Sequence, residues 1–378
     1  MSQHFSSPPQ LIMGADALEV AAGRLPTMGT KALVVTDPGI VAAGIDRIVT
    51  DVLGSALPFH VFSDVVGNPD IATVESAAQA REVAGADVLI AIGGGSSIDV
   101  AKSVAVLGTN GGSIVDYEGV DRFANRPLPV VVIPTTVGSG SEVTKGAVIT
   151  NPQTQVKMVI VSDLMFAEVA VLDPRVVAKL PSRIAATTGM DALTHAIEAY
   201  VALGANPVTD AICLGAIELI GAHLVAASQG DPDSLYHMLV ASSMAGIGFH
   251  DAGLGAVHAL ANTLGAHFGV HHGTANALFL PYVIDFNLTA APARFARIAQ
   301  ALGEDVHGLS DDEAAARASV AVHRLAEQTG VPRTMAELGV PRDAIPALAR
   351  DALLQADLPG NPRPVTLDDL IGLYERAA

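Results

Sequence analysis

Val88-Leu-Ile-Ala-Ile-Gly-Gly-Gly-Ser-Ser-Ile-Asp99 joins an apolar run to three glycines and the start of a helical stretch. The run Val88–Ile92 predicts a buried strand, and the alanine- and valine-rich residues after Asp99 predict a helix. A strand that passes directly into a helix is typical of parallel sheets with crossover helices. This stretch therefore places the N-terminal part of the chain in the α/β class.

The same alternation recurs through the first 180 residues. Further strands are predicted by β-branched runs at residues 31–37, 59–62, 129–134, 156–161 and 168–173. From about Leu180 onward the periodicity is helical and interrupted by prolines, with no strand pattern. We predict a Rossmann-like parallel-sheet α/β domain over residues 1–180 and an all-α domain over residues 181–378.

The composition argues against several classes of protein. The chain has 378 residues, a formal net charge of -18 at pH 7 and a single cysteine, Cys213. The negative charge disfavours nucleic acid and anionic membranes as partners. No apolar run approaches the roughly 20 residues of a membrane span, and the first residues lack a signal-peptide pattern. We expect a cytoplasmic protein that has no internal disulfide and binds neither nucleic acid nor membrane.

Ligands of parallel α/β sheets bind beyond the carboxyl ends of the strands, where three loops of this chain fall. Gly93–Ser96 can bring backbone N–H groups to an anion, or can form only a tight turn. Asp37 can accept hydrogen bonds from a ribose diol or can cap the next turn, and Asp99 can be a helix-start carboxylate. Residues 135–144, rich in hydroxyls and glycines, suit a polar ligand or an ordinary capped loop. Neither a G-x-G-x-x-G nor a Walker motif is present, so both interpretations stay open.

A candidate metal site lies in Met190-Asp-Ala-Leu-Thr-His195. Helical residues four apart share a face, so Asp191 and His195 can form half of a divalent-metal site. Such a pair is more often a surface feature, but the apolar residues around it indicate burial, where an unpaired Asp is costly. Residues 249–274 add five of the twelve histidines without any Lys, Arg or Glu. Core histidines with satisfied hydrogen bonds are the alternative, but this concentration favours a metal site.

The charge pattern also limits the substrate. No Lys or Arg occurs between Arg183 and Arg294, a stretch that contains all candidate metal ligands. A phosphate or polycarboxylate would find no cationic partner there. We expect a small, neutral, mostly apolar substrate.

Several long motifs, in this order, resemble the iron-containing (group III) alcohol dehydrogenases, and closely their lactaldehyde reductase/1,2-propanediol oxidoreductase branch. The motifs are Gly93–Ser96 with Asp99, Pro134–Thr144, Ala186–Glu198, Gly255–His258 followed by His272-Gly-Thr-Ala-Asn-Ala, and Gly360–Arg363 with Thr366–Tyr374. The resemblance covers nearly the whole chain. It implies a dehydroquinate synthase-like fold, with NAD or NADP in the cleft between the two domains.

The resemblance also implies the site residues. One divalent metal, usually iron(II) and in some members zinc, would be bound by Asp191, His195, His258 and His272. The dinucleotide would be bound by Asp37 at the adenosine ribose, by Asn68 nearby, by Gly94, Gly95, Ser96 and Asp99 along the pyrophosphate and nicotinamide, and by Thr135, Thr136, Thr144 and Lys157. The acid at Asp37 favours NAD over NADP, because a 2′-phosphate there would meet a negative charge.

Two positions depart from the lactaldehyde reductase branch. Asn262 stands where that branch carries a histidine implied to relay protons, four residues after His258. An amide cannot take up a proton at neutral pH, so the relay must use water, ribose hydroxyls or another histidine such as His267. Gly146 replaces a polar side chain on the nicotinamide side, which favours a wider substrate pocket.

The predicted activity is reversible hydride transfer between NAD and a small primary alcohol or diol, with the metal polarising the substrate oxygen. The resemblance implies a homo-oligomer, a dimer or larger. An NAD- and metal-dependent lyase of the dehydroquinate synthase type is the main alternative, but its phosphate-bearing substrate requires Lys and Arg near the metal. A hydrolase without nucleotide leaves the glycine- and threonine-rich loops unexplained. A metal- or nucleotide-binding protein without activity is the least favoured alternative, because it would not need both the nucleotide loops and the metal site.

Overall fold

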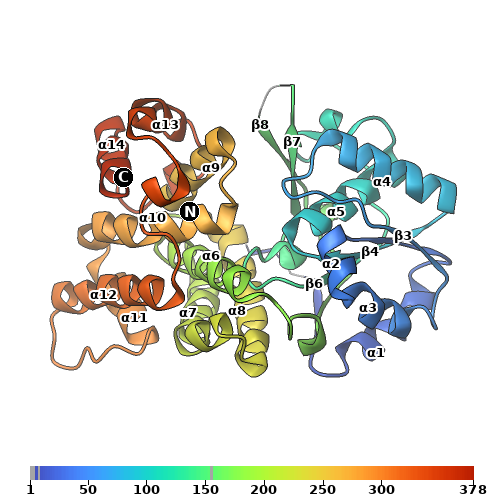
Figure 1. Ribbon diagram of the computed structural model, residues 1–378, viewed down its shortest axis with the longest axis horizontal. Coiled ribbons are helices and arrows are strands. Elements are labelled where there is room, and N and C mark those ends of the chain that lie inside the picture. Colours follow the sequence, from blue (N-terminus) through green and yellow to red (C-terminus); the bar gives the residue numbers. More distant parts are fainter. Residues whose placement is uncertain (1–4, 7–8, 154–155) are drawn as a thin grey trace. The chain divides into compact units, whose positions relative to one another are not determined.

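A computed structural model describes residues 5–6, 9–153 and 156–378 of the chain. Its internal contacts divide these residues into two compact units (Figure 1). One unit spans Ser6–Thr136 and Gly140–Lys179, and the other is built from Leu180–Ala378 and includes Val137–Ser139.

A six-stranded, entirely parallel sheet forms the centre of the first unit. The strand order is β1-β9-β6-β4-β2-β3. The bounds are β1 Gln10–Met13, β2 Ala32–Val35, β3 Phe59–Phe62, β4 Val88–Gly93, β6 Val130–Pro134 and β9 Val169–Leu172. Five of these strands were predicted, and the parallel-sheet fold class is confirmed. The short edge strand β1 was not predicted, because only Ile12 of its four residues is buried.

The prediction for residues 156–161 was right about the strand but wrong about its sheet. β8 (Val156–Val161) belongs to a separate three-stranded sheet of order β5-β8-β7, with β5 at Gly119–Val120 and β7 at Gly146–Asn151. It pairs antiparallel with β7. A hairpin joins neighbouring segments without a crossover helix, so β7 and β8 need not enter the parallel sheet.

Helices of the first unit are α1 Ala17–Ala22, α2 Pro38–Ala43, α3 Ile45–Leu53, α4 Ile71–Ala84 and α5 Gly95–Asn110. β4 is buried over its whole length, between β2 and β6, which explains its uninterrupted apolar sequence. Gly93 ends it with a φ of 153°, a conformation that favours glycine. The chain then enters α5 at once, so the N-terminus of α5 lies at the carboxyl end of the central strand.

The second unit is helical throughout the described residues of 180–378. Its helices are α6 Ser182–Val201, α7 Pro207–Ser228, α8 Pro232–Ala252, α9 Ala256–Phe268, α10 His272–Asn287, α11 Pro292–Ala301, α12 Asp311–Thr329, α13 Ile345–Ala352 and α14 Leu367–Arg376. α6 is the core helix, because every residue from Ala185 to Val201 is buried. It packs against α7, α8 and α10 (Figure 1).

Among the described residues, α7 alone has the length and composition that a membrane span requires. About a third of its most apolar window is buried inside the chain. A core helix of a soluble protein passes the same test, so this one helix is weak support for a membrane segment.

Candidate metal and nucleotide sites

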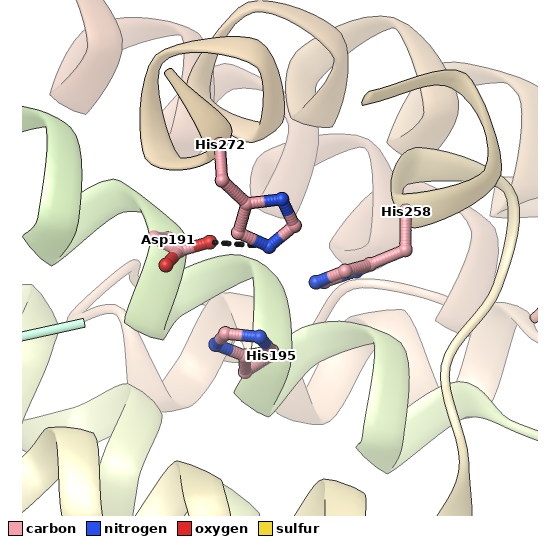
Figure 2. Close-up of side chains that lie close together, drawn as sticks. All are labelled: Asp191, His195, His258 and His272. Atoms are coloured by element: carbon pink, nitrogen blue, oxygen red, sulfur yellow. Dashed lines mark ion pairs between the residues drawn. The ribbon is translucent and has the colours of Figure 1, made fainter. Parts of the chain in front are cut away.

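The four predicted metal ligands come from three helices of the second unit. Asp191 and His195 lie one turn apart on buried α6, His258 lies in the first turn of α9, and His272 begins α10. One ligand atom from each residue lies within 4.8 Å of the others. Figure 2 shows the four side chains directed at a common centre. Asp191, His195 and His258 are buried, whereas His272 keeps 32% of its side chain exposed and marks the open side of the centre.

Two of the imidazoles have their outer nitrogen occupied by an acceptor. His258 Nδ1 lies 2.5 Å from Oε2 of Glu198, and His195 Nδ1 lies 3.2 Å from the carbonyl oxygen of Gly138. An ionised carboxylate and a carbonyl can only accept, so in each neutral ring Nδ1 carries the hydrogen. The lone pair of Nε2 then remains for a ligand at the centre. Partners of this kind orient histidine in metal sites and increase its basicity.

Glu198 also fixes the start of α9. Its Oε1 accepts a hydrogen bond of 2.7 Å from the backbone N–H of Val257. Glu198 lies on α6 three residues after His195, so one carboxylate connects the helix of two predicted ligands with the helix of the third.

The contacts of Asn276 show which kinds of atom face the centre. Its Nδ2 lies 2.6 Å from Asp191 Oδ1, 3.2 Å from His258 Nε2 and 3.1 Å from His272 Nε2. An amide has two N–H groups and cannot satisfy three acceptors at once. The centre thus contains more hydrogen-bond acceptors than hydrogen-bond donors. A divalent cation binds to such a set of lone-pair atoms from one carboxylate and several imidazoles.

The protonation states of Asp191 and His195 also suit a cation; at His258, burial lowers the pKa, but the Glu198 carboxylate outweighs that effect and the pKa is raised. Burial alone would raise the pKa of Asp191, but the three histidines and the Asn276 amide outweigh it, and the pKa is lowered. Burial lowers the pKa of His195 to about 4. At neutral pH the centre therefore contains a carboxylate and a neutral imidazole, as metal binding requires.

Glycines allow this close packing around α6. A Cβ at Gly138 would lie 2.6 Å from the carbonyl oxygen of Thr188, and one at Gly273 would lie 2.9 Å from that of Thr187. Both distances are shorter than any real Cβ contact. Glycine at these positions lets the Gly138 carbonyl reach His195 Nδ1 and lets α10 come close enough for His272 to reach the centre.

In the first unit, several predicted nucleotide residues lie at the carboxyl ends of neighbouring parallel strands. Asp37 follows β2, Gly94–Ser96 follow β4, and Thr135 and Thr136 follow β6. A Cβ at Gly94 would lie 3.1 Å from Thr136 Cγ2, so Thr136 closes tightly on the glycine turn. Gly94, Gly95 and Ser96 form the N-terminus of α5, whose N–H groups and dipole favour an anion.

Of the two interpretations of Asp37, the structure shows the cap of the next turn, and the contact with a ribose stays a prediction. Its Oδ1 caps α2 by accepting hydrogen bonds from the backbone N–H groups of Gly39 and Ile40 at 2.9 and 3.0 Å. Within the described residues, its Oδ2 accepts a single, long hydrogen bond of 3.5 Å from Ser97 Oγ. One carboxylate oxygen is thus structural, and the other keeps acceptor capacity.

Orphaned polar atoms gather around this edge of the sheet. Thr36 Oγ1, Asp99 Oδ1 and Thr135 Oγ1 are buried without a hydrogen-bond partner among the described residues. Buried polar atoms are normally paired, so such a group calls for a ligand or ordered water. Together with the glycine turn, these atoms fit a polar ligand such as a dinucleotide.

The remaining predicted residues are less closely gathered. Thr144 donates from Oγ1 to the carbonyl oxygen of Ser141 at 3.2 Å. Lys157 lies on β8, where burial lowers its pKa and the charge of Asp99 opposes that effect. Asn68 is exposed and has a φ of 53°, and no contact of its side chain joins it to the other predicted residues in the described part of the chain.

Sequence reasoning missed four contributors: Glu198, Gly138, Asn276 and Lys102. Lys102 is fully buried, and its Nζ donates to the carbonyl oxygens of Ser141 at 2.7 Å and Thr144 at 2.5 Å. Glu198 had a detectable signal, because a buried acid three residues after a predicted ligand shares the helix face of that ligand. The Gly138 carbonyl had none, because any residue carries one.

The comparisons agree along the whole chain. Residues 8–174 match the family described as iron-containing alcohol dehydrogenase, and residues 185–378 match the C-terminal part of the Fe-containing alcohol dehydrogenase family. The NAD-dependent methanol dehydrogenase of Bacillus methanolicus is 38% identical, over 99% of this chain and 99% of its own length. The lactaldehyde reductase of Escherichia coli is 39% identical, over 92% of each chain. A crystal structure of a 1,3-propanediol oxidoreductase superposes over 100% of both chains, with a TM-score of 0.97 and 36% identity. These matches cover both units and the motifs that carry the predicted sites, and the chain belongs to the iron-containing alcohol dehydrogenase family.

Proposed function

We propose that this protein is a metal-dependent, NAD-linked dehydrogenase that interconverts small neutral primary alcohols or diols and their aldehydes. Residues 1–180 would form the dinucleotide-binding domain, and residues 181–378 would bind the metal and the substrate. The observation that carries the proposal is the convergence of one carboxylate and three imidazole ligand atoms within 4.8 Å.

Asp191, His195, His258 and His272 would hold the metal, iron(II) or zinc. When bound, a divalent metal acts as a Lewis acid that lowers the pKa of a substrate hydroxyl or polarises a carbonyl. Glu198 and Gly138 keep two imidazoles oriented for it. Because His272 is the most exposed of the four, the substrate oxygen would approach from its side.

The cofactor would be NAD. It supplies the acceptor for a hydride from the carbinol carbon, and the protein orients it. The glycine turn and the α5 N-terminus would bind the pyrophosphate, and Asp37 Oδ2 would accept hydrogen bonds from the adenosine ribose. Asn68, Asp99, Thr135, Thr136, Thr144 and Lys157 remain proposed contacts. Asp37 supports NAD over NADP by repelling a 2′-phosphate.

The substrate class follows from charge. The chain has no Lys or Arg from residue 184 to residue 293, a range that contains all four proposed ligands. A phosphorylated substrate would lack a partner, which argues against the lyase alternative. A Cβ at Gly146 would make ordinary contacts of 3.4 and 3.6 Å with residues 160 and 161, so a side chain could stand there, and we propose that its absence widens the pocket. We therefore expect aldehydes bulkier than three carbons to be accepted.

A cytoplasmic location and a homo-oligomer, a dimer or larger, complete the proposal. Cys213 is buried, and burial raises the pKa of its thiol to about 12, so it is suited to packing rather than to disulfide chemistry. Only 33% of the most apolar window of α7 is buried inside the chain, which supports association between copies.

The test is anaerobic purification with metal analysis, followed by NADH absorbance assays with neutral alcohols and aldehydes. We expect about one metal ion per chain, NADH formation from short primary alcohols and NADH oxidation by their aldehydes. Turnover without net change in NADH would indicate the lyase reaction instead. A protein that binds neither metal nor NAD would overturn the proposal.

A further inference from the structure

The proposed reaction releases a proton. At position 262, where the lactaldehyde reductase branch carries a histidine implied to relay protons, this chain has Asn262. Asn262 lies on α9 one turn after His258, so both side chains project from the same face of that helix. Its amide cannot accept a proton. His267 is not a substitute, because it lies nine positions after His258, which places it on the opposite face of α9. His267 Nε2 there lies 2.7 Å from Asp351 Oδ2.

Asn262 instead holds a carboxylate. Its Nδ2 donates to Oδ2 of Asp357 at 3.3 Å. Asp357 precedes the short 3-10 helix Leu358–Gly360, which packs against α9. It is partly buried, as is Asn262, whereas most carboxylates are well exposed.

The segment that carries Asp357 is firmly anchored at the start of α9. Asn361 Oδ1 accepts a hydrogen bond of 3.3 Å from the backbone N–H of Ala256, and the carbonyl oxygen of Gly360 accepts one of 2.9 Å from Leu203. A Cβ at Gly360 would lie 2.3 Å from the carbonyl oxygen of Leu254. The position of the Asp357 carboxylate beside α9 is therefore fixed by the backbone around it.

We propose that Asp357 is the proton acceptor of the dehydrogenase reaction, with Asn262 as the residue that positions its carboxylate. This inference rests on the proposed function. In alcohol oxidation the C–H electron pair passes as hydride to NAD⁺, the O–H bond breaks, and its electrons complete the C=O bond. The proton passes to the Asp357 carboxylate, directly or through water, and the resulting carboxylic acid releases it to solvent. In aldehyde reduction the same carboxylic acid returns the proton.

The surroundings of Asp357 support a proton-exchanging role. Burial raises the pKa of Asp357, and the negative charge of Glu198 raises it further. The charge of His258 and the hydrogen bond from Asn262 lower this pKa, but the net result is a raised pKa. A carboxyl group with a raised pKa is better matched to proton transfer near neutral pH than an ordinary one. The Asp351–His267 pair is more exposed, with 51% and 37% of the two side chains accessible.

The principal test is Asp357→Asn in the metal-loaded enzyme, with Asp351→Asn as the matched control. Asn at position 357 keeps an oxygen that can accept from Asn262, so the local packing is preserved. We expect kcat/KM for alcohol oxidation to fall about 100-fold, the usual scale for loss of a proton-transfer group. The acidic limb of the pH profile should disappear, while metal content, NADH affinity and melting temperature stay unchanged. Asp351→Asn should behave as the unmodified protein.

Two rescues distinguish proton transfer from a structural role. Formate should restore activity to Asp357→Ala, and Asn262→His should restore it to Asp357→Asn, because each returns a proton acceptor. A readout without turnover is carbon-13 NMR of the carboxyl groups, in which Asp357→Asn should remove a resonance that titrates above the usual aspartate range.

Full activity and an unchanged pH profile in Asp357→Asn would overturn the inference. So would a loss of activity that neither rescue reverses, or one that parallels a loss of metal or NADH binding. If the unmodified protein, loaded with metal, oxidises no alcohol with NAD, the proposed function itself fails, and the fault does not lie with Asp357.

Discussion

At the scale of single residues, Glu198 is a partner on which the proposed metal centre depends. Glu198→Gln keeps the shape but places an N–H group or a weaker acceptor opposite His258 Nδ1. The ring is then no longer held with its Nε2 lone pair at the centre. We expect metal affinity to fall about 10- to 100-fold with the fold intact, measured by competition with a chelating dye. Asp285→Asn is the control. Asp285 lies on α10, and its carboxylate contacts His323 of α12 away from the centre, so this change should leave the metal affinity unchanged. Equal affinity in Glu198→Gln and the unmodified protein would contradict this role.

A second residue-scale prediction concerns pH. Burial raises the pKa of Asp99 from 3.8 to about 6, against the opposing charge of Lys102. The folded protein therefore holds this proton more tightly than the unfolded chain does. The contribution of Asp99 to the free energy of unfolding is present below pH 3.8 and is lost as the pH rises to about 6, a change of about 3 kcal/mol. Asp99→Asn should gain stability relative to the unmodified protein over this window in denaturant titrations.

Asp70→Asn supplies a control of opposite sign. Hydrogen bonds from Thr73 to this helix-capping carboxylate lower its pKa, so its contribution is lost as the pH falls. The stability of Asp70→Asn relative to the unmodified protein should therefore improve toward acidic pH. A difference for Asp99→Asn that does not change between pH 4 and pH 7 would refute the assignment of the raised pKa.

Sequence reasoning went furthest for residues whose chemistry is unusual for their surroundings. Asp191 and His195 could be predicted because their spacing places both on one face of an apolar helix. The choice of His272 over His271 came from the family resemblance, because periodicity does not separate adjacent histidines. The pairing of Glu198 with His258 joins side chains 60 positions apart, and a sequence contains no distance between them.

At the scale of elements, the centre requires α10 to approach α6 closely. Gly273→Ala would place a Cβ 2.9 Å from the carbonyl oxygen of Thr187, a backbone atom that cannot turn away. We expect a loss of about 1–3 kcal/mol of stability and weaker metal binding, because His272 is displaced with the start of its helix. Gly372→Ala is the matched control, since nothing lies within 4 Å of its Cβ on α14. It should be neutral or stabilising by up to about 1 kcal/mol. Gly273→Ala with unchanged stability and affinity would show that the two helices have room to adjust.

Elements were predictable where burial shaped their sequence. β4 is buried on both faces and appears in the sequence as an unbroken apolar run, so it was found. β1 is a short edge strand with exposed Gln10 and Met13, so its pattern resembled a loop. β7 and β8 have strand sequences, but their membership of a second sheet depends on a hairpin pairing that periodicity does not encode.

At the scale of the whole molecule, metal and nucleotide are proposed to bind to different compact units. Metal that binds only to the folded protein should raise the melting temperature, and removing the metal should lower it. At a free metal concentration of 100 times Kd, the free energy of unfolding should rise by about 2.7 kcal/mol. NADH binding, followed by fluorescence, should survive chelation because its proposed contacts lie in the other unit. Asp191→Ala should show no metal-induced thermal shift. Loss of NADH binding on chelation would contradict the separation of the two sites.

The most direct measurement is anomalous X-ray diffraction from crystals grown with iron(II) under anaerobic conditions. We predict a single strong anomalous peak per chain, with Asp191 Oδ and the Nε2 atoms of His195, His258 and His272 at roughly 2.0–2.2 Å. A peak elsewhere in the chain, or one that lacks any of these four ligands, would contradict the central claim.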